Sequence, residues 1–210
     1  MTASVTRAPL FAPVVPAALA LADGTVLRGR SIGAAGHATG EVVFNTAMTG
    51  YQEILTDPSY AGKIVTLTYP HIGNVGVNPE DAESARPSAA GLVIRDLSRV
   101  VSNFRATGDL STWLAGNGIV GIADLDTRKL TRVLRERGAQ NGCIVAGGAQ
   151  DDAAIADAVR RAGAAPSMAG QDLARVVSCR EPYAWTGGAW ALGEGYGAPP
   201  PPRFHVVAYD

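Results

Sequence analysis

The chain has few of the residues that most catalytic and metal sites need. It contains 2 cysteines and 3 histidines among 210 residues, and the cysteines do not form a Cys-x-x-Cys pair. A disulfide framework and a zinc site both require several such residues at short spacings, so neither is expected. Scarce, unpaired cysteines are typical of a reducing compartment, and we therefore expect a cytoplasmic protein.

The chain also lacks an excess of charge of either sign. Its formal net charge is −1 at pH 7, from 18 Lys and Arg against 19 Asp and Glu. Proteins that bind nucleic acid or anionic membranes usually carry a basic surplus, so we expect neither partner.

Long apolar runs are scarce as well. The mildly apolar N-terminus is interrupted by Pro9, Pro13 and Pro16. This pattern argues against a signal peptide or a membrane span, and we interpret residues 1–16 as a loose leader.

What the chain does contain is typical of a globular mixed α/β protein with many turns, including 25 glycines and 13 prolines. Asp23-Gly24 between two apolar runs predicts a β-hairpin. Short apolar runs predict further strands at 41–44, 63–69, 91–96 and 118–123. We expect loops at the glycine-rich residues 33–40, which match no phosphate-binding motif, and a turn at 70–76.

Apolar residues at helical spacing predict three helices. They cover residues 109–114, 127–137 and 151–161. Asp126 is the predicted N-cap of the second helix and Gly138 its stop. In the third helix we expect Ile155 and Val159 to face inward.

The pattern loosens after Gly163, and four consecutive prolines at 199–202 are typical of an extended spacer. Residues 204–210 then resemble a buried strand. We predict one domain at 17–165, a linker at 166–203, and the first strand of a second, truncated domain at 204–210.

The most informative stretch is the polar run from Phe44 to Tyr60. Burying a polar group without a partner costs roughly 1–3 kcal/mol, so many such groups between apolar strands suggest a surface that meets a ligand or another protein. The run ends in Asp-Pro-Ser-Tyr, which predicts a rigid turn that presents Ser59.

The sequence offers only weak candidates for catalysis. Cys143 opens an apolar run and is expected to be a small buried hydrophobe, while Cys179 has only Arg180 nearby. A serine hydrolase that uses Ser59 with Asp57 and His71 stays an open hypothesis, although no Gly-x-Ser-x-Gly elbow surrounds the serine. The histidines show no metal-ligand spacing, so no metal site is predicted.

Basic residues of the second helix gather on its polar face, namely Lys129, Arg132, Arg135 and Arg137. Two interpretations stay open for this basic face. It is either a solvated helix surface or a surface that docks a partner.

Several longer runs share the pattern of one known family. They are ADGT at 22–25, GEVVFNT at 40–46, MTGYQEILTDPSY at 48–60, TLTYPHIGN at 66–74, GLVIRD at 91–96, IADLDTRKLT at 122–131 and GAQNG at 138–142. From about residue 19 to residue 210 the chain resembles the small, glutamine-hydrolysing subunit of carbamoyl phosphate synthetases, with a weaker match between 149 and 203. Ala47 departs from the pattern, because many relatives have serine there.

The resemblance implies a compact β/β/α N-terminal domain, joined by a linker to a class I glutamine amidotransferase domain whose first strand would be residues 204–210. The Cys, His and Glu that hydrolyse glutamine in the family would lie beyond Asp210. No catalytic, cofactor-binding or metal-binding residue is therefore expected here, and the chain alone is expected to be inactive. Ser59 matches the serine with which the family's N-terminal domain contacts glutamine.

The resemblance also implies a partner. In the family, ammonia from glutamine passes to a large subunit that uses ATP, Mg and bicarbonate to make carbamoyl phosphate for arginine and pyrimidine synthesis. The basic face and the segment Asn45–Glu53 are the candidate contacts with that subunit. The alternative is a stand-alone, non-catalytic interaction module, and the sequence after Asp210 would distinguish the two.

Overall fold

The computed structural model describes residues 14–148, 150–198 and 201–209. Contacts within the chain define two units, one that ends at Gln171 and one that begins at Asp172. The predicted leader lies largely outside the described residues, and Pro16 at its end already belongs to the first strand.

The first unit is built around a closed β-barrel. Its strands follow the order β1 (Pro16–Leu21), β2 (Val26–Ser31), β8 (Val120–Ala123), β6 (Gly91–Val93), β4 (Ile64–Leu67), β3 (Gly36–Asn45) and β9 (Gln140–Ala146). β9 pairs back with β1 and closes the barrel. The pairs β3–β4, β4–β6 and β6–β8 are parallel, whereas the other four pairs of the barrel are antiparallel.

Apolar side chains from every barrel strand meet in one buried cluster. Along β1, Leu19 and Leu21 join this cluster while Ala20 packs on the other side, as the two-residue period of a strand requires. α3 (Thr127–Arg137) adds Leu130 and Leu134 to the same cluster. Burying each such leucine contributes roughly 1.5–3 kcal/mol.

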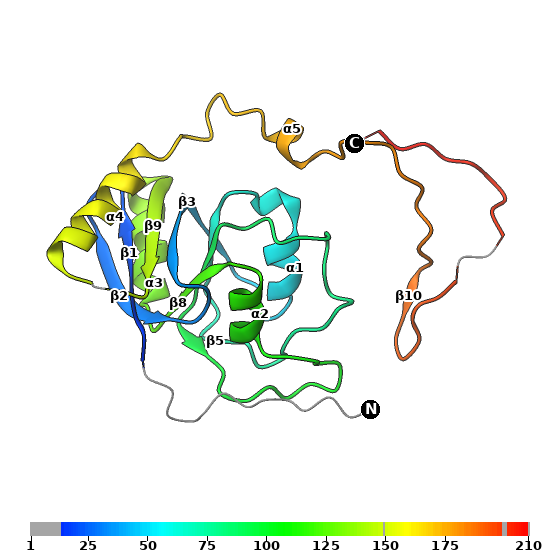
Figure 1. Ribbon diagram of the computed structural model, residues 1–210, viewed down its shortest axis with the longest axis horizontal. Helices are drawn as coiled ribbons and strands as arrows, with labels where there is room; N and C mark the ends of the chain where they lie inside the picture. The colour runs from blue at the N-terminus through cyan, green and yellow to red at the C-terminus, as the bar shows by residue number, and fades with distance from the viewer. Residues whose placement is uncertain (1–13, 149, 199–200, 210) are drawn as a thin grey trace. The chain divides into compact units, whose positions relative to one another are not determined.

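Helices cover the outside of the barrel. α4 (Asp152–Ala164) lies along β1 and β9 (Figure 1). α1 (Tyr51–Thr56) and α2 (Leu110–Gly116) pack against outward side chains of the parallel strands, such as Leu67 and Leu92. The hairpin and the helix at 127–137 are confirmed, the latter with Asp126 as N-cap and Gly138 as C-cap.

The prediction for the inner face of α4 is wrong in part. Its fully buried residues are Ala158 and Ala162, whereas Ile155 and Val159 are only half-buried. The two alanines pack against Ala20. Small side chains at the contact let the helix lie close to the barrel wall.

The expected loop at 33–40 is also wrong in part, because residues 36–40 belong to β3 and pair with β9. Gly40 lies opposite Gly142 in this pairing. A Cβ atom at Gly40 would lie 2.1 Å from the carbonyl oxygen of Gly62, so glycine permits a close approach of backbones here. Gly40 therefore serves strand packing rather than a loop.

The predicted turn at 70–76 contains a short strand. β5 (His71–Ile72) pairs in parallel with β7 (Asp96–Leu97). The pairing partner lies 25 residues along the chain, which a local turn pattern does not reveal.

The second unit contains α5 (Leu173–Val177) and the paired strands β10 (Trp190–Ala191) and β11 (Gly195–Tyr196). The strand predicted at 204–210 is not formed among the described residues 204–209, which are exposed; Asp210 lies outside them. A strand needs a neighbouring edge for its backbone groups, and β10 and β11 pair with each other. The assignment of 204–210 to a second domain stays a prediction.

One threonine hydroxyl is buried in the wall of the barrel. Thr66 in β4 is fully buried, and its Oγ1 finds no hydrogen-bond partner among the described residues. Thr66→Val removes this unpaired group and is expected to raise the free energy of unfolding by about 1 kcal/mol, measured by urea denaturation. The half-buried Thr68 provides the control, since Thr68→Val should give no such gain. A loss of stability in Thr66→Val would show that the hydroxyl is satisfied.

Candidate functional site

Part of the polar run lies in the core. Gln52 is buried, and its Nε2 donates to the Asn78 carbonyl at 2.6 Å while its Oε1 accepts from the Asn78 amide at 3.0 Å. The buried Tyr51 hydroxyl donates to the Gly76 carbonyl at 2.7 Å, and burial raises the pKa of Tyr51. The interpretation of Asn45–Glu53 as a contact surface is therefore wrong for Tyr51 and Gln52, whose polar groups are satisfied inside the chain.

The beginning of the run remains open to solvent. Phe44 is 41% exposed and Met48 60% exposed, and Thr46 and Thr49 are exposed as well. The side-chain Nδ2 of Asn45 donates to the Tyr60 hydroxyl at 2.8 Å, which connects the two ends of the run. Residues 44–49 stay a candidate contact surface.

The predicted turn at Ser59 is confirmed. Pro58–Tyr60 form a single turn of 3-10 helix, η1, and the Asp57 carboxylate accepts from the Ser59 amide at 2.8 Å. Lys63 Nζ donates to the Ser59 carbonyl at 3.1 Å. Ser59 itself is exposed, and its hydroxyl has no hydrogen-bond partner among the residues that the structure describes. The turn therefore holds a free hydroxyl in a fixed position.

The arrangement does not support a serine hydrolase. His71 Nδ1 lies 2.9 Å from Asp96 Oδ2, and no hydrogen bond joins His71 to Ser59 or Asp57 within the described part of the chain. Asp57 instead caps the turn. A serine nucleophile needs a base within hydrogen-bond reach, and that contact is missing here.

The remaining candidates add no catalytic group. Cys143 is buried, and burial raises the pKa of its thiol, which disfavours the nucleophilic thiolate. Cys179 is exposed. Within residues 14–148, 150–198 and 201–209, no cluster of His, Cys, Asp or Glu is suited to a metal ion, and no helix is long and apolar enough to cross a bilayer.

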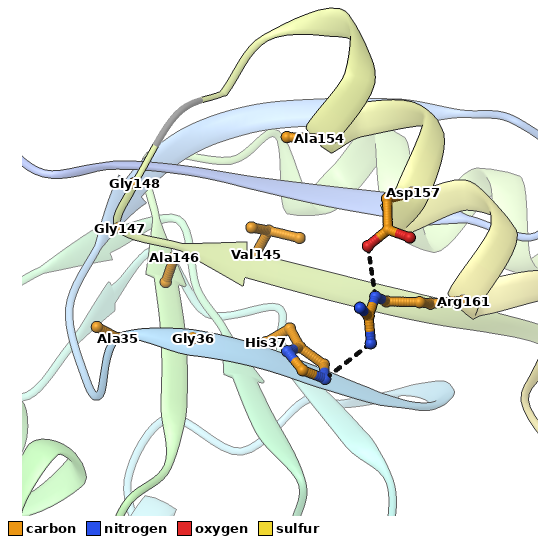
Figure 2. A pocket seen from close by; sticks show the side chains of 10 residues that line it. All are labelled: Ala35, Gly36, His37, Val145, Ala146, Gly147, Gly148, Ala154, Asp157 and Arg161. Carbon is orange, nitrogen blue, oxygen red and sulfur yellow. Dashed lines mark hydrogen bonds and ion pairs between the residues drawn. The ribbon is translucent and has the colours of Figure 1, made fainter.

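A hollow that sequence reasoning missed lies between β3, β9 and α4, with a volume of about 390 Å³. Figure 2 shows Arg161 between two neighbours: its Nε donates to Asp157 Oδ2 at 2.6 Å, and its guanidinium lies 3.1 Å from His37 Nε2. The spacing of Asp157 and Arg161 by four residues was the available signal. Asp157 also pairs with Arg160, so one carboxylate faces two guanidinium groups beside the hollow. The hollow does not include Ser59.

The basic face of α3 is exposed along its length. Arg137 forms an ion pair with Asp23 at 2.5 Å, and Arg132 lies 3.8 Å from Glu136. Lys129 and Arg135 form no ion pair with a described residue. Both interpretations of this face, solvated surface and docking surface, remain compatible with these contacts.

Comparison with known proteins gives a clear relationship. Residues 19–144 match the family described as carbamoyl-phosphate synthase small chain, CPSase domain. The carbamoyl phosphate synthase small chain of Ralstonia nicotianae is 63% identical over 195 residues, covering 93% of this chain and 50% of the relative. That of Rubrivivax gelatinosus is 64% identical over 202 residues, covering 94% and 53%.

The chain thus spans about half the length of the curated relatives that it matches. Among solved structures, an aminopeptidase from Aneurinibacillus sp. strain AM-1 aligns with 65% of this chain and 31% of its own, at 19% identity and a TM-score of 0.36, which is too low to support an argument. The family match covers most of the barrel, from β1 into β9. The chain belongs to the carbamoyl-phosphate synthase small chain family.

Proposed function

We propose that this chain is the N-terminal part of a glutamine-hydrolysing subunit that supplies ammonia to a large, ATP- and Mg-dependent subunit for the synthesis of carbamoyl phosphate. The family match over residues 19–144 carries this proposal. The two subunits would form a heterodimer in the cytoplasm, and the product would serve arginine and pyrimidine synthesis. The barrel then acts as scaffold and docking domain, and the chain alone lacks hydrolytic activity.

In this proposal Ser59 contacts glutamine bound to the second domain of the complete subunit. A serine hydroxyl both donates and accepts, so it can bind either the ammonium or the carboxylate of an amino acid. The Asp57 cap and the Lys63 contact fix the turn before any ligand arrives. Little conformational entropy is then lost on binding, which favours affinity.

Ser59→Ala in the complete subunit is expected to raise KM for glutamine about tenfold, because one hydrogen bond to the ligand is worth about 1.4 kcal/mol when the ligand is charged. Synthesis from free ammonia should be unchanged, because it bypasses the glutamine site. Steady-state kinetics with glutamine and with ammonium measure both quantities.

Ser102→Ala serves as the matched control, because Ser102 is also an exposed serine in a loop. It should leave both activities unchanged. An equal loss of glutamine-dependent and ammonia-dependent synthesis in Ser59→Ala would contradict a glutamine contact and indicate a defect in folding or docking instead.

The alternative function is that of a stand-alone interaction module. The exposed Phe44 and Met48 and the unpaired basic residues of α3 are compatible with it, since each could contact another protein. Co-purification of the complete subunit with a large ATP-using chain would favour the synthetase. Its failure would favour the module.

A further inference from the structure

Two asparagines of the chain, Asn117 and Asn141, precede a glycine. An asparagine side chain can react with the backbone nitrogen of the next residue. That nitrogen attacks the side-chain carbonyl carbon, a C–N bond forms, and the side-chain nitrogen takes up the proton and leaves as ammonia. Water then opens the cyclic imide to aspartate or isoaspartate. Glycine favours the reaction, because it has no Cβ to shield the nitrogen and it tolerates the bent backbone of the ring.

The structure places the first pair at an exposed helix end. Asn117 is the C-cap of α2, and residues 115–118 are all exposed. Its side-chain Nδ2 donates to the Trp113 carbonyl at 2.8 Å, and the Gly118 amide donates to the Ala115 carbonyl at 3.2 Å. A Cβ atom at Gly118 would have nothing within 4 Å, so there is space for the ring to form.

The reaction at the first pair needs the last turn of α2 to open. Both hydrogen bonds must break, and the peptide after Asn117 must rotate, because its ψ of 6° directs the Gly118 nitrogen away from the side chain. Helix ends fray at little cost in free energy, and α2 has only 7 residues. The reactive conformation is therefore accessible without unfolding of the barrel.

The second pair lies inside the barrel wall. Asn141 and Gly142 belong to β9, which pairs with β1 on one side and β3 on the other. The Asn141 carbonyl accepts from the Ala22 amide at 2.9 Å, and its Nδ2 donates to the Ala165 carbonyl at 2.9 Å. A Cβ atom at Gly142 would lie 2.6 Å from Val42 Cγ2, so side chains already crowd this backbone. Ring closure here would require the barrel to open.

We propose that Asn117 is a deamidation site of this protein and that the barrel protects Asn141. The reaction is spontaneous, and water is its other reactant. Its rate follows the population of the open conformation, which is large at a frayed helix end and small in a core strand. The two pairs have the same local sequence, so the fold alone distinguishes them.

The product changes the end of α2. A carboxylate at position 117 has no proton to donate to the Trp113 carbonyl. It also lies beside the last carbonyl groups of the helix, whose partial negative charge repels it. The modified chain therefore gains one negative charge, which ion exchange detects, and it has a weaker helix end.

The test keeps the purified full-length protein in warm, mildly alkaline buffer and follows each site by mass spectrometry. Trypsin cleaves after lysine and arginine, so the two sites fall in separate peptides, residues 106–128 and 138–160. Asn117 is expected to deamidate at least about tenfold faster than Asn141, because opening costs little at helix ends and up to the full unfolding free energy in core strands. In urea, which removes the fold, the two sites should react at similar rates.

Variants identify the source of the acidic form. Asn117→Gln should stop its growth, because glutamine would have to close a larger ring, which forms more slowly. Asn74→Gln is the matched control: Asn74 is likewise exposed but precedes Val75, and its replacement should leave the acidic form unchanged.

Two results would overturn the proposal. The first is equal deamidation of Asn117 and Asn141 in the folded protein, or none at Asn117 while the protein in urea reacts. The second is a ratio of rates that stays the same in urea, since the difference would then come from the local sequence and not from the fold.

Discussion

Gly29→Ala is expected to lower the free energy of unfolding by about 3 kcal/mol, the upper part of the range for overpacked cores. A Cβ atom at this position in β2 would lie 2.1 Å from the Ala123 carbonyl oxygen and 2.5 Å from Leu125 Cδ1. The carbonyl cannot retreat easily, because Ala123 is paired with Arg30 across β2 and β8. Urea denaturation of the chain, followed by circular dichroism, measures the change.

Gly116→Ala provides a control of opposite sign. Gly116 ends α2, has space around its Cα, and lacks a positive φ. Alanine should stabilise the helix there by roughly 0.5–1 kcal/mol. If Gly29→Ala were as stable as the wild type, the close approach of β2 and β8 would be contradicted.

Gln52→Ala is expected to cost about 3 kcal/mol, because it removes both partners of the Asn78 backbone. Asn78 is 8% exposed, so its amide and carbonyl would be left largely without water. The two hydrogen bonds also connect α1 to the segment that follows β5. The same denaturation experiment measures the loss.

Thr49→Ala, an exposed position in the same polar run, should change stability by less than about 0.5 kcal/mol. Gln52→Glu should cost at least as much as Gln52→Ala near neutral pH, because it buries a carboxylate whose second oxygen faces the Asn78 carbonyl without a proton to donate. Equal stability of Gln52→Ala and Thr49→Ala would show that Gln52 is not part of the core.

Features that depend on a few adjacent residues were predictable from the sequence. Asp126 caps α3 through a hydrogen bond from the Lys129 amide at 2.9 Å, and Asp57 caps the Ser59 turn in a similar way. Both bonds span two or three residues, so the local pattern contains all the chemistry involved. The family resemblance likewise rested on contiguous runs, and the match to residues 19–144 confirms it.

The predictions that were wrong concern residues whose hydrogen-bond or strand-pairing partner lies far along the chain. Gln52 was assigned to a surface because its partner Asn78 follows 26 residues later. Residues 36–40 were assigned to a loop because β9, their partner, begins about 100 residues downstream. A polar or glycine-rich run does not reveal whether distant backbone groups will satisfy it.

Ion pairs between distant residues show the same division. Arg30 pairs with Asp124 and His71 with Asp96, and no spacing among these residues in the sequence signals the two contacts. By itself the sequence determined the hairpin, the capped helices, the Ser59 turn and the family, because these depend on local hydrogen bonds and contiguous motifs. Only the tertiary structure decided which polar residues are buried and which charged residues pair with one another. Those outcomes depend on how segments far apart in the sequence come together, through strand register and through side-chain contacts with distant backbone groups, which local patterns do not encode.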